Sequence, residues 1–307
     1  MYRLEWEKTK EGTARLLGVA EMPSELTVPD EIEGLPITEV GPYCFAKNKY
    51  LERVVLPDTV AKIDRMAFYN CTSLKELEVG SAIEELGSDA FMNCHQLHEL
   101  KVRCWAQERS GIRLILRQIS HDMYVHFLGS QRADKGTIDT ENSEEARLLF
   151  TEYYETYDEV APAHLFGRNI EGEGFRARQC FKEGVFEYAR YDSTFQKACA
   201  EEREATLCEM AMNRLRYPVG LTEEVRKRYA EYVTEHLAHI CQTAVLRREP
   251  ELIEFLCKNQ LMEQAVLEQT ACFAAECEWA EGGALMLRLK EQYFALTKKN
   301  RYEFEDF

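Results

Sequence analysis

The amino-acid sequence predicts an α+β protein of more than one domain, with a short N-terminal β-strand solenoid, a mixed middle segment and a C-terminal helical array. Three observations lead to this prediction. Residues 26–102 repeat one apolar pattern every 23 residues, residues 105–190 lack that period, and residues 191–296 follow helical spacing. A chain of 307 residues is long enough for two or three domains.

The repeat is visible as apolar residues that recur at the same place in three successive copies. These are Val40, Ile63 and Leu86; Phe45, Phe68 and Phe91; Leu51, Leu74 and Leu97; Val54, Leu77 and Leu100; and Leu56, Val79 and Val102. A unit of this length cannot bury its apolar face alone, so neighbouring copies must stack. We therefore expect the three phenylalanines to form one continuous buried column within a solenoid domain covering residues 1–104.

Apolar and polar residues alternate inside each copy, as in "LKELEV". Alternation with a period of two predicts a strand in which Leu77 and Val79 face the core while Glu76 and Glu78 face solvent. The solvent-facing positions of three adjacent strands form the candidate partner-binding patch: Arg53, Val55, Glu76, Glu78, Glu99 and Lys101. Its acidic centre predicts a basic partner. Ordinary solvated strand positions would give the same pattern, and the sequence leaves both interpretations open.

Two segments carry a resemblance to a known family. "IDRMAFYNCTSLKELEV" and "LGSDAFMNCHQLHELKV" resemble the units of the BspA-like leucine-rich repeat family, which combine Ala-Phe, Asn-Cys and Leu around a short strand. A partial copy with five extra residues begins at Leu26, and residues 1–25 then resemble the cap of the first turn. Family members are often long exported surface proteins with many repeats, and we expect this chain to differ from them in both respects. The resemblance implies protein binding.

The Asn-Cys pairs allow two interpretations. Asn70-Cys71 and Asn93-Cys94 could present reactive thiols. Stacked repeats would instead place them inside the coil, where Asn bonds to loop backbone and Cys behaves as a small hydrophobic residue. We favour the structural interpretation.

The middle segment, residues 105–190, is less regular. "GIRLILRQI" and "DMYVHFL" fit either two strands or a helix and a strand, whereas "NSEEARLLFTEYYETYDE" predicts a helix that starts at Asn142 or Ser143. "EGEGFRARQCF" suggests either an anion pocket or a tight turn before a strand. The cationic residues Arg103, Arg109, Arg113 and Arg117 are expected to dock on the acidic helices of the same chain or on an acidic partner.

The helical array begins after Tyr191. One helical pattern stops at Pro218, and another starts at Thr222 with acids in its first turn. Leu252 and Leu256 match Leu285 and Leu289 at an offset of 33 residues, the ankyrin period, so the array resembles degenerate ankyrin-like helix pairs. Residues 297–307 are expected to form a loosely held tail.

Composition and charge narrow the range of partners. The chain carries 54 acidic and 38 basic side chains, which gives a net charge of −16. Such a surface repels phosphate backbones and anionic lipids, so we expect a protein partner, no nucleic acid and no membrane insertion. The number of cysteines is odd, 11, no CxxC pair occurs, and no signal-peptide core is visible. These features predict reduced thiols and a cytoplasmic protein.

No motif for catalysis or for a cofactor is found. His95 with His98, and His236 with His239 near Cys241, have spacings that a metal could use, but a zinc site needs three or four convergent ligands. We therefore expect no cofactor, no metal and no catalytic residues, and a non-catalytic interaction or scaffold protein. The alternative is an enzyme or effector whose site lies in residues 105–190. A pocket there with two or more convergent titratable groups would favour that alternative.

Overall fold

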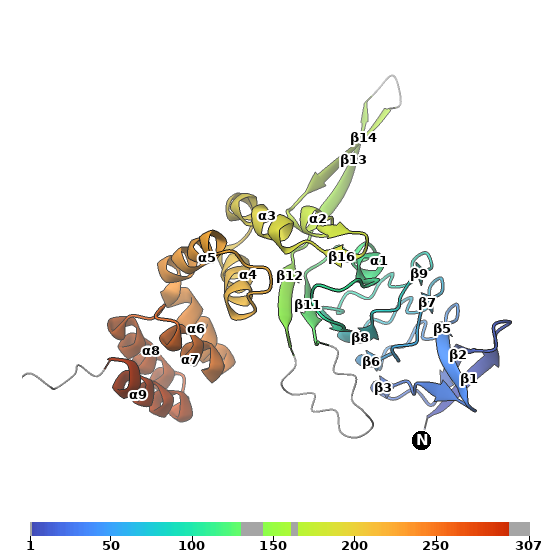
Figure 1. Ribbon diagram of the computed structural model, residues 1–307, viewed down its shortest axis with the longest axis horizontal. Helices are drawn as coiled ribbons and strands as arrows, with labels where there is room; N and C mark the ends of the chain where they lie inside the picture. The colour runs from blue at the N-terminus through green and yellow to red at the C-terminus, as the bar shows by residue number, and fades with distance from the viewer. Residues whose placement is uncertain (1, 130–143, 161–164, 295–307) are drawn as a thin grey trace, which may run out of the picture. The chain divides into compact units, whose positions relative to one another are not determined.

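The computed structural model forms two compact units, Met1–Leu221 and Thr222–Phe307. The residues that it describes are 2–129, 144–160 and 165–294 (Figure 1). The predicted domain boundaries after residues 104 and 190 both fall inside the first unit. The predicted tail, 297–307, lies outside the described residues.

The first unit contains two sheets of six strands, and the one that we call the six-stranded sheet has the order β12-β11-β10-β8-β6-β3. Its strands are β3 Glu25–Thr27, β6 Arg53–Val55, β8 Glu76–Gly80, β10 Glu99–Arg103, β11 Met123–Phe127 and β12 Ala146–Phe150. Neighbouring strands are parallel except β11 and β12, which are antiparallel. Each repeat therefore adds one parallel strand, and the order of the strands follows the order of the repeats.

A second sheet lies on the other side of the solenoid and follows the order β1-β2-β5-β7-β9. Its strands are β1 Arg3–Lys8, β2 Ala14–Ala20, β5 Leu35–Val40, β7 Lys62–Ile63 and β9 Glu85–Leu86, with β4 Glu31–Ile32 paired to β5. The β1–β2 hairpin covers the first turn. The extra residues of the partial repeat form the β4–β5 hairpin, whose turn uses positive φ angles at Glu33 and Gly34.

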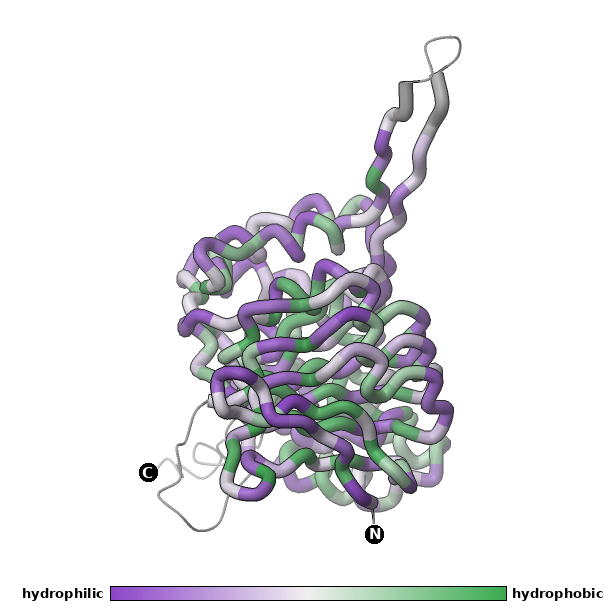
Figure 2. The backbone as a smooth tube through the Cα atoms, turned by 90° about the vertical axis from the view of Figure 1, so that its right-hand side faces the viewer, coloured by the Kyte–Doolittle hydropathy of each residue, from purple (hydrophilic) through white to green (hydrophobic). Residues whose placement is uncertain are grey.

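The repeats bury their apolar residues as continuous rows. Across the six-stranded sheet, one row of paired positions consists of Leu26, Val54, Leu77, Leu100, Val125 and Leu148, each at most 1% exposed. Figure 2 shows the stacked turns, with hydrophobic residues recurring in each. The ring of Phe68 lies 4.8 Å from that of Phe45 and 5.1 Å from that of Phe91, centroid to centroid. The predicted aromatic column is confirmed.

The Asn-Cys pairs form ladders between turns, as the structural interpretation predicts, but Asn93 and Asn70 bond to each other where the sequence predicts bonds to loop backbone. The thiol of Cys71 donates to the carbonyl of Phe45, and that of Cys94 donates to the carbonyl of Phe68, both at 3.0 Å. The side chain of Asn93 donates to that of Asn70 at 2.7 Å. Both asparagines have positive φ angles, a conformation that Asn tolerates better than most residues.

The solenoid continues beyond the recognisable repeats. "GIRLILRQI" contains helix α1, Ile112–Leu116, and "DMYVHFL" contains strand β11, which pairs with β10 as a further parallel strand. The helix predicted from Asn142 or Ser143 is wrong for the described residues. Strand β12 forms there instead, and strands β13, Tyr154–Val160, and β14, Leu165–Glu171, follow as a hairpin.

The segment "EGEGFRARQCF" has a structural role, because its Arg178 side chain binds the backbone of neighbouring segments. It contains helix α2, Gly174–Ala177, and ends at the first residue of strand β15, Phe181–Lys182, which pairs with β16, Val185–Phe186. The guanidinium of Arg178 is buried and donates to the backbone carbonyls of Leu116, Ile119, His121, Thr151 and Gly174. The anion-pocket interpretation is therefore wrong for Arg178, because its donors bind the chain itself.

Two helices complete the first unit: α3 Tyr188–Glu201 and α4 Glu204–Arg216. They are joined by a buried ion pair between Asp192 and Arg214, with Nε 2.7 Å from Oδ1. Helix α4 packs on strand β12. It therefore contacts the strand at the end of the six-stranded sheet.

The second unit is helical. Its helices are α5 Glu223–Glu235, α6 Leu237–Arg247, α7 Pro250–Lys258, α8 Gln264–Glu276 and α9 Ala280–Phe294. Thr222 caps α5 by accepting a hydrogen bond from the amide of Val225, as its sequence position predicts. Helix α6 contacts α8, and α7 contacts α9, so two successive helix pairs stack.

Candidate functional site

The six residues of the predicted patch lie on one face of the six-stranded sheet. Strand register aligns Arg53, Glu76 and Glu99 in one row. It aligns Val55, Glu78 and Lys101 in the next row. All six side chains are half-buried, whereas the residues between them are buried in the core. We call this surface the outer sheet face, and it also includes Arg103, Tyr124, His126 and Arg147.

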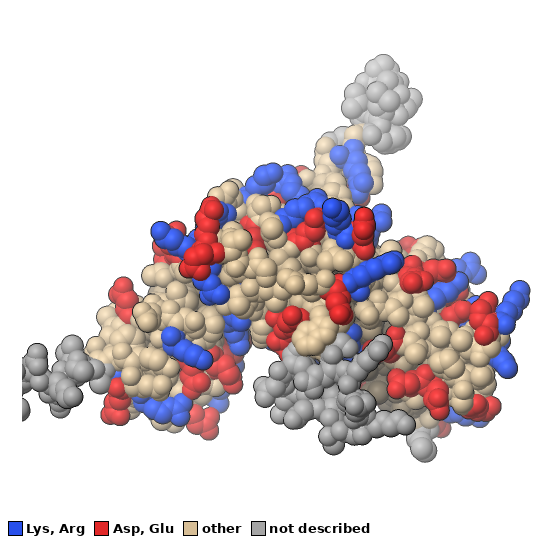
Figure 3. Space-filling model, viewed as in Figure 1, with Lys and Arg blue, Asp and Glu red and all other residues tan. Residues whose placement is uncertain are grey.

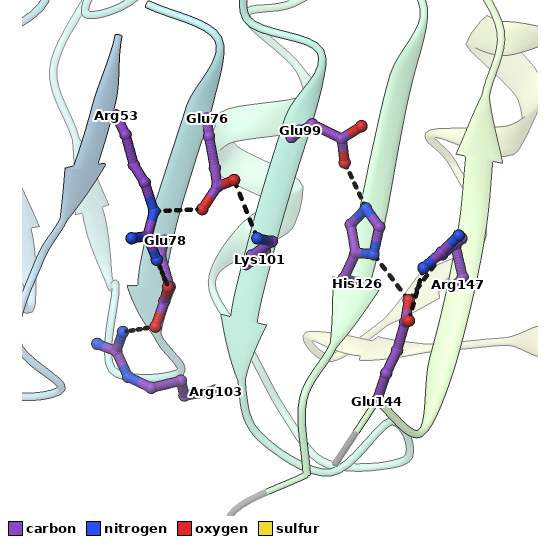
Figure 4. A network of polar contacts seen from close by, with 9 residues as sticks. All are labelled: Arg53, Glu76, Glu78, Glu99, Lys101, Arg103, His126, Glu144 and Arg147. Carbon is purple, nitrogen blue, oxygen red and sulfur yellow. Dashed lines mark hydrogen bonds and ion pairs between the residues drawn. The ribbon is translucent and has the colours of Figure 1, made fainter. Parts of the chain in front are cut away.

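Cross-strand ion pairs hold the centre of the outer sheet face (Figure 4). The guanidinium of Arg53 on β6 contacts both glutamates of β8, with Nε 2.6 Å from Glu76 and Nη2 3.1 Å from Glu78. The ammonium of Lys101 on β10 reaches back to Glu76 at 2.9 Å. Each of these side chains therefore connects neighbouring repeats.

Arg103 extends the same network. Its Nη1 atom lies 2.6 Å from Glu78, its Nε atom lies 2.7 Å from Asp58, and it also donates to the carbonyl of Leu56. Arg113 donates to Gln179 at 3.3 Å. Arg103 and Arg113 therefore bond to residues of the first unit, and docking on the acidic helices or on an acidic partner stays a prediction for this group of arginines.

Positive charges balance the acidic centre that the sequence predicts. Figure 4 shows four glutamates together with four Arg or Lys side chains and one histidine. Burial alone would raise the pKa of Glu76, but hydrogen bonds and charge from Lys101 and Arg53 outweigh it and lower that pKa. Figure 3 likewise shows side chains of both signs interspersed over the side of the molecule in view.

At the β11 end of the face, His126 bridges two carboxylates. Its Nδ1 atom lies 2.7 Å from Glu144, and its Nε2 atom contacts Glu99. Burial alone would lower the pKa of His126, but the hydrogen bonds to Glu144 and Glu99 outweigh burial and raise it. His126 and Glu144 lie outside the repeats, so no periodic signal in the sequence could identify them.

Helix α4 and the residues after it border the same end of the face. The hydroxyl of Tyr217 donates to Glu144 at 2.8 Å, and its ring lies 5.4 Å from the guanidinium carbon of Arg147. Tyr124 on β11 contacts Glu209 of α4. The outer sheet face is therefore bounded on this side by polar contacts.

A pocket lies at the base of the β13–β14 hairpin in the first unit. Its volume is about 770 Å³, and its lining includes Glu152, Tyr154, Phe175, Arg176, Glu202 and Arg203. Glu202 is half-buried, and burial together with the negative charges of Asp122, Glu152 and Glu201 raises its pKa. The pocket thus brings several titratable groups together, partly within residues 105–190.

Within residues 2–129, 144–160 and 165–294, no group of three or more His, Cys, Asp or Glu side chains is placed to hold a metal ion. In that part of the chain, no helix has both the length and the apolar character needed to cross a membrane.

Comparison with known proteins supports the repeat assignment. A family model described as "BspA type Leucine rich repeat region" matches residues 31–107 in six copies. No curated protein matches the chain.

Three solved structures align with about a third of the chain. A leucine rich cell surface protein from Faecalibacterium prausnitzii A2-165 is 28% identical over 32% of this chain and 31% of that protein, with a TM-score of 0.30. A Leucine Rich Repeat protein from T. pallidum is 19% identical over 32% and 68%, with a TM-score of 0.23. A leucine-rich repeat protein from Bacteroides ovatus ATCC 8483 is 16% identical over 34% and 47%, with a TM-score of 0.22.

The repeat period, the stacked phenylalanines and the match to the family model agree with one another. Residues 31–107 of this chain form a leucine-rich repeat region of the BspA type.

Proposed function

We propose that the chain is a non-catalytic protein-interaction or scaffold protein that binds a protein partner through the outer sheet face. The observation that carries this proposal is the network of cross-strand ion pairs formed by Arg53, Glu76, Glu78, Lys101 and Arg103. It runs over parallel strands spaced by about 4.8 Å. Repeat proteins commonly present such extended surfaces to their partners.

The network favours binding because the charged side chains are already ordered. A side chain that is fixed before association loses less conformational entropy when the partner arrives. Arg53 is held by two glutamates, and Glu76 is held by two cations. A partner that matches this pattern of alternating charge gains specificity from electrostatic complementarity.

The overall charge supports a basic protein partner. With a net charge of −16, the chain attracts cationic proteins at long range and repels nucleic acid. All eleven cysteines are free thiols, which fits a reducing compartment, and we propose that the protein acts in the cytoplasm. The stacked helix pairs of the second unit support an ankyrin-like second binding module.

The test is affinity capture from native cytosol with a neutralised face. Replacing Glu76 and Glu78 by Lys would place like charges beside Arg53, so Glu76→Gln with Glu78→Gln is preferable because glutamine still accepts hydrogen bonds. The matched control is Glu39→Gln with Glu85→Gln, because both of these acids form ion pairs on the other sheet.

We expect the control variant to retain the wild-type partners and the face variant to lose most of their yield. Thermal melting curves of both variants should overlay that of the wild type within a few degrees. Retention of the same partners at the same yield by the face variant would reject the outer sheet face as the binding surface.

An enzyme is the second candidate, and the pocket at the base of the hairpin favours it. A half-buried carboxyl with a raised pKa, here Glu202, is suited to general acid chemistry. The check is turnover of chromogenic ester, glycoside and phosphate substrates by the wild type and by Glu202→Gln. Activity that disappears in Glu202→Gln would support catalysis, and equal background rates in both proteins would reject it.

A further inference from the structure

His126 is a buried histidine with a carboxylate on each ring nitrogen. It lies on β11 with only 10% of its side chain exposed, between Glu99 of β10 and Glu144, which precedes β12 (Figure 4). A neutral imidazole has one donor nitrogen and one acceptor nitrogen, whereas an imidazolium has two donors. Ionised carboxylates only accept hydrogen bonds. With both carboxylates ionised, the arrangement therefore favours the positively charged form of His126.

The surrounding side chains decide which of the two carboxylates has, in the described part of the chain, no other hydrogen-bond partner than His126. The other charged groups next to it are Lys101 on β10 and Arg147 on β12, each opposite His126 in the strand register. The ammonium of Lys101 bonds to Glu76 instead. On the side of α4, Tyr217 bonds to Glu144, and Glu209 bonds to Tyr124.

Glu144 keeps other partners when His126 is neutral, but Glu99 does not. Arg147 donates two hydrogen bonds to Glu144, at 2.8 and 2.7 Å, and Tyr217 donates a third at 2.8 Å. Among the described residues, His126 is the one side chain that bonds to the carboxylate of Glu99. The side chain of Glu99 is 38% exposed, so a partner has access to it.

We propose that His126 is a pH-sensitive latch, which holds the carboxylate of Glu99 while it is charged and releases it into the outer sheet face when it loses its proton. The proposal rests on the function assigned to that face and adds its regulation. At this end of the face, a charged His126 and Arg147 balance Glu99 and Glu144. Deprotonation leaves this end of the face with one negative charge in excess and leaves the carboxylate of Glu99 without a hydrogen-bonded cation within the described residues, although the charge of Arg147 still acts on it. A Lys or Arg side chain of a basic partner then binds there.

The direction of the pH effect follows from the two hydrogen bonds. They favour the charged form and so raise the pKa of His126 above the ordinary value of 6.5. The latch is therefore closed below about pH 6.5 and opens as the pH rises through the raised value. A basic partner should bind about tenfold more tightly in the open state, which corresponds to one charge-assisted hydrogen bond.

The latch can be tested in the full chain without a partner. Nitrogen-15 NMR of labelled histidine reports the protonation of both ring nitrogens, and carbon-13 NMR of labelled glutamate reports the surroundings of the Glu99 carboxylate. We expect His126 to titrate above pH 6.5 and the Glu99 signal to move with the same midpoint. Glu85, which pairs with Lys62 on the other sheet, should show no such step.

Two variants separate the latch from general effects of pH. His126→Asn should abolish the step in the Glu99 signal, and Glu99→Gln should lower the midpoint of His126. A midpoint at or below pH 6.5 in the wild type, or a Glu99 signal that does not follow His126, would overturn the latch. Glu99→Gln keeps the latch testable if His126→Asn fails to fold.

The NMR result is independent of the proposed function, so the two can fail separately. If the latch titrates as expected but Glu76→Gln with Glu78→Gln retains all partners, the latch stands and the binding surface is wrong. With a partner in hand, wild-type affinity should rise about tenfold across the transition, whereas Glu99→Gln should show little change. Equal pH dependence in both proteins would show that the partner does not use Glu99 and would overturn the regulatory part of the proposal.

Discussion

Phe68 lies in the middle of the aromatic column and is fully buried between Phe45 and Phe91. Phe68→Ala should lower the free energy of unfolding by about 3 to 5 kcal/mol, because it removes apolar contacts and leaves a cavity. Urea unfolding monitored by circular dichroism measures the change. Met92→Ala is the control, since Met92 is 48% exposed and its truncation should cost no more than about 0.5 kcal/mol. A loss below about 1 kcal/mol for Phe68→Ala would contradict stacking in the core.

Arg178 is the residue whose role the sequence least reveals. It is buried, and burial lowers its pKa to about 10, yet it donates to carbonyls from three separate segments. Arg178→Met should destabilise the first unit by about 3 kcal/mol or more, because buried carbonyls lose their donors. Arg178→Lys should recover little of the lost stability, since an ammonium group lacks the planar set of donors that a guanidinium offers.

Thermal unfolding of these variants is the measurement, with Arg176→Lys as the control because the side chain of Arg176 is 51% exposed. A melting temperature for Arg178→Met equal to that of the wild type would show that water replaces the guanidinium.

His126 predicts a pH-dependent contribution to stability. Its pKa in the folded state is raised, so its stabilising contribution is fully present below the unfolded value, about 6.5, and is lost as the pH rises through the folded value. The stability gap between the wild type and His126→Asn should therefore be larger at pH 6 than at pH 9. Urea unfolding at both pH values measures this gap. A gap that widens with pH would contradict a charged His126.

At the scale of elements, the turns of the solenoid depend on the asparagine ladder. Asn70→Ala removes the hydrogen bond from Asn93 and places alanine at a positive φ angle of 59°. Alanine adopts the left-handed region less readily than asparagine, and the hydrogen bond is lost as well, so we expect a loss of roughly 1 to 2 kcal/mol in urea unfolding. Asn70→Gly removes the same hydrogen bond but adopts this φ easily, so it should be the milder change. Equal losses of stability in Asn70→Ala and Asn70→Gly would show that the positive φ angle at residue 70 does not contribute to the cost.

Strand β12 shows why the sequence of an element can mislead. Residues 142–160 carry acids followed by a short apolar run, which predicts a capped helix. In the structure, Leu148 continues the core row beside Val125, and Leu149 is buried on the opposite side of the strand. A short run that is buried on both sides cannot be distinguished from a helix by its periodicity. The pairing with β11 and the packing of α4 decide the outcome.

At the scale of the whole molecule, the cysteines differ in burial. All eleven are free; Cys199 and Cys272 are exposed, Cys277 is half-buried and the other eight are buried. Burial raises the pKa of thiols in the interior, for example Cys104 and Cys208 to about 12. Under native conditions without reductant, a thiol reagent should therefore label Cys199 and Cys272 first.

After unfolding, the same reagent should label all eleven cysteines. Mass spectrometry of labelled peptides identifies the sites. Rapid native labelling of Cys71 or Cys94 would contradict their placement between the turns. A reproducible shortfall of two thiols in anaerobically purified protein would reveal a disulfide.

The sequence by itself determined the repeat, the buried aromatic column and the outward position of the six patch residues. Those features depend on contacts between copies of one short pattern, and such contacts have a period that is visible in the chain. The tertiary structure decided the partners of these residues. Arg103 bonds to Asp58, and His126 bonds to both Glu99 and Glu144. The distances in sequence between these partners do not match the repeat period. The sequence therefore predicts an acidic patch, whereas the fold places positively charged side chains from neighbouring strands beside its glutamates. The reason is that side-chain pairing across a sheet depends on strand register and not on composition.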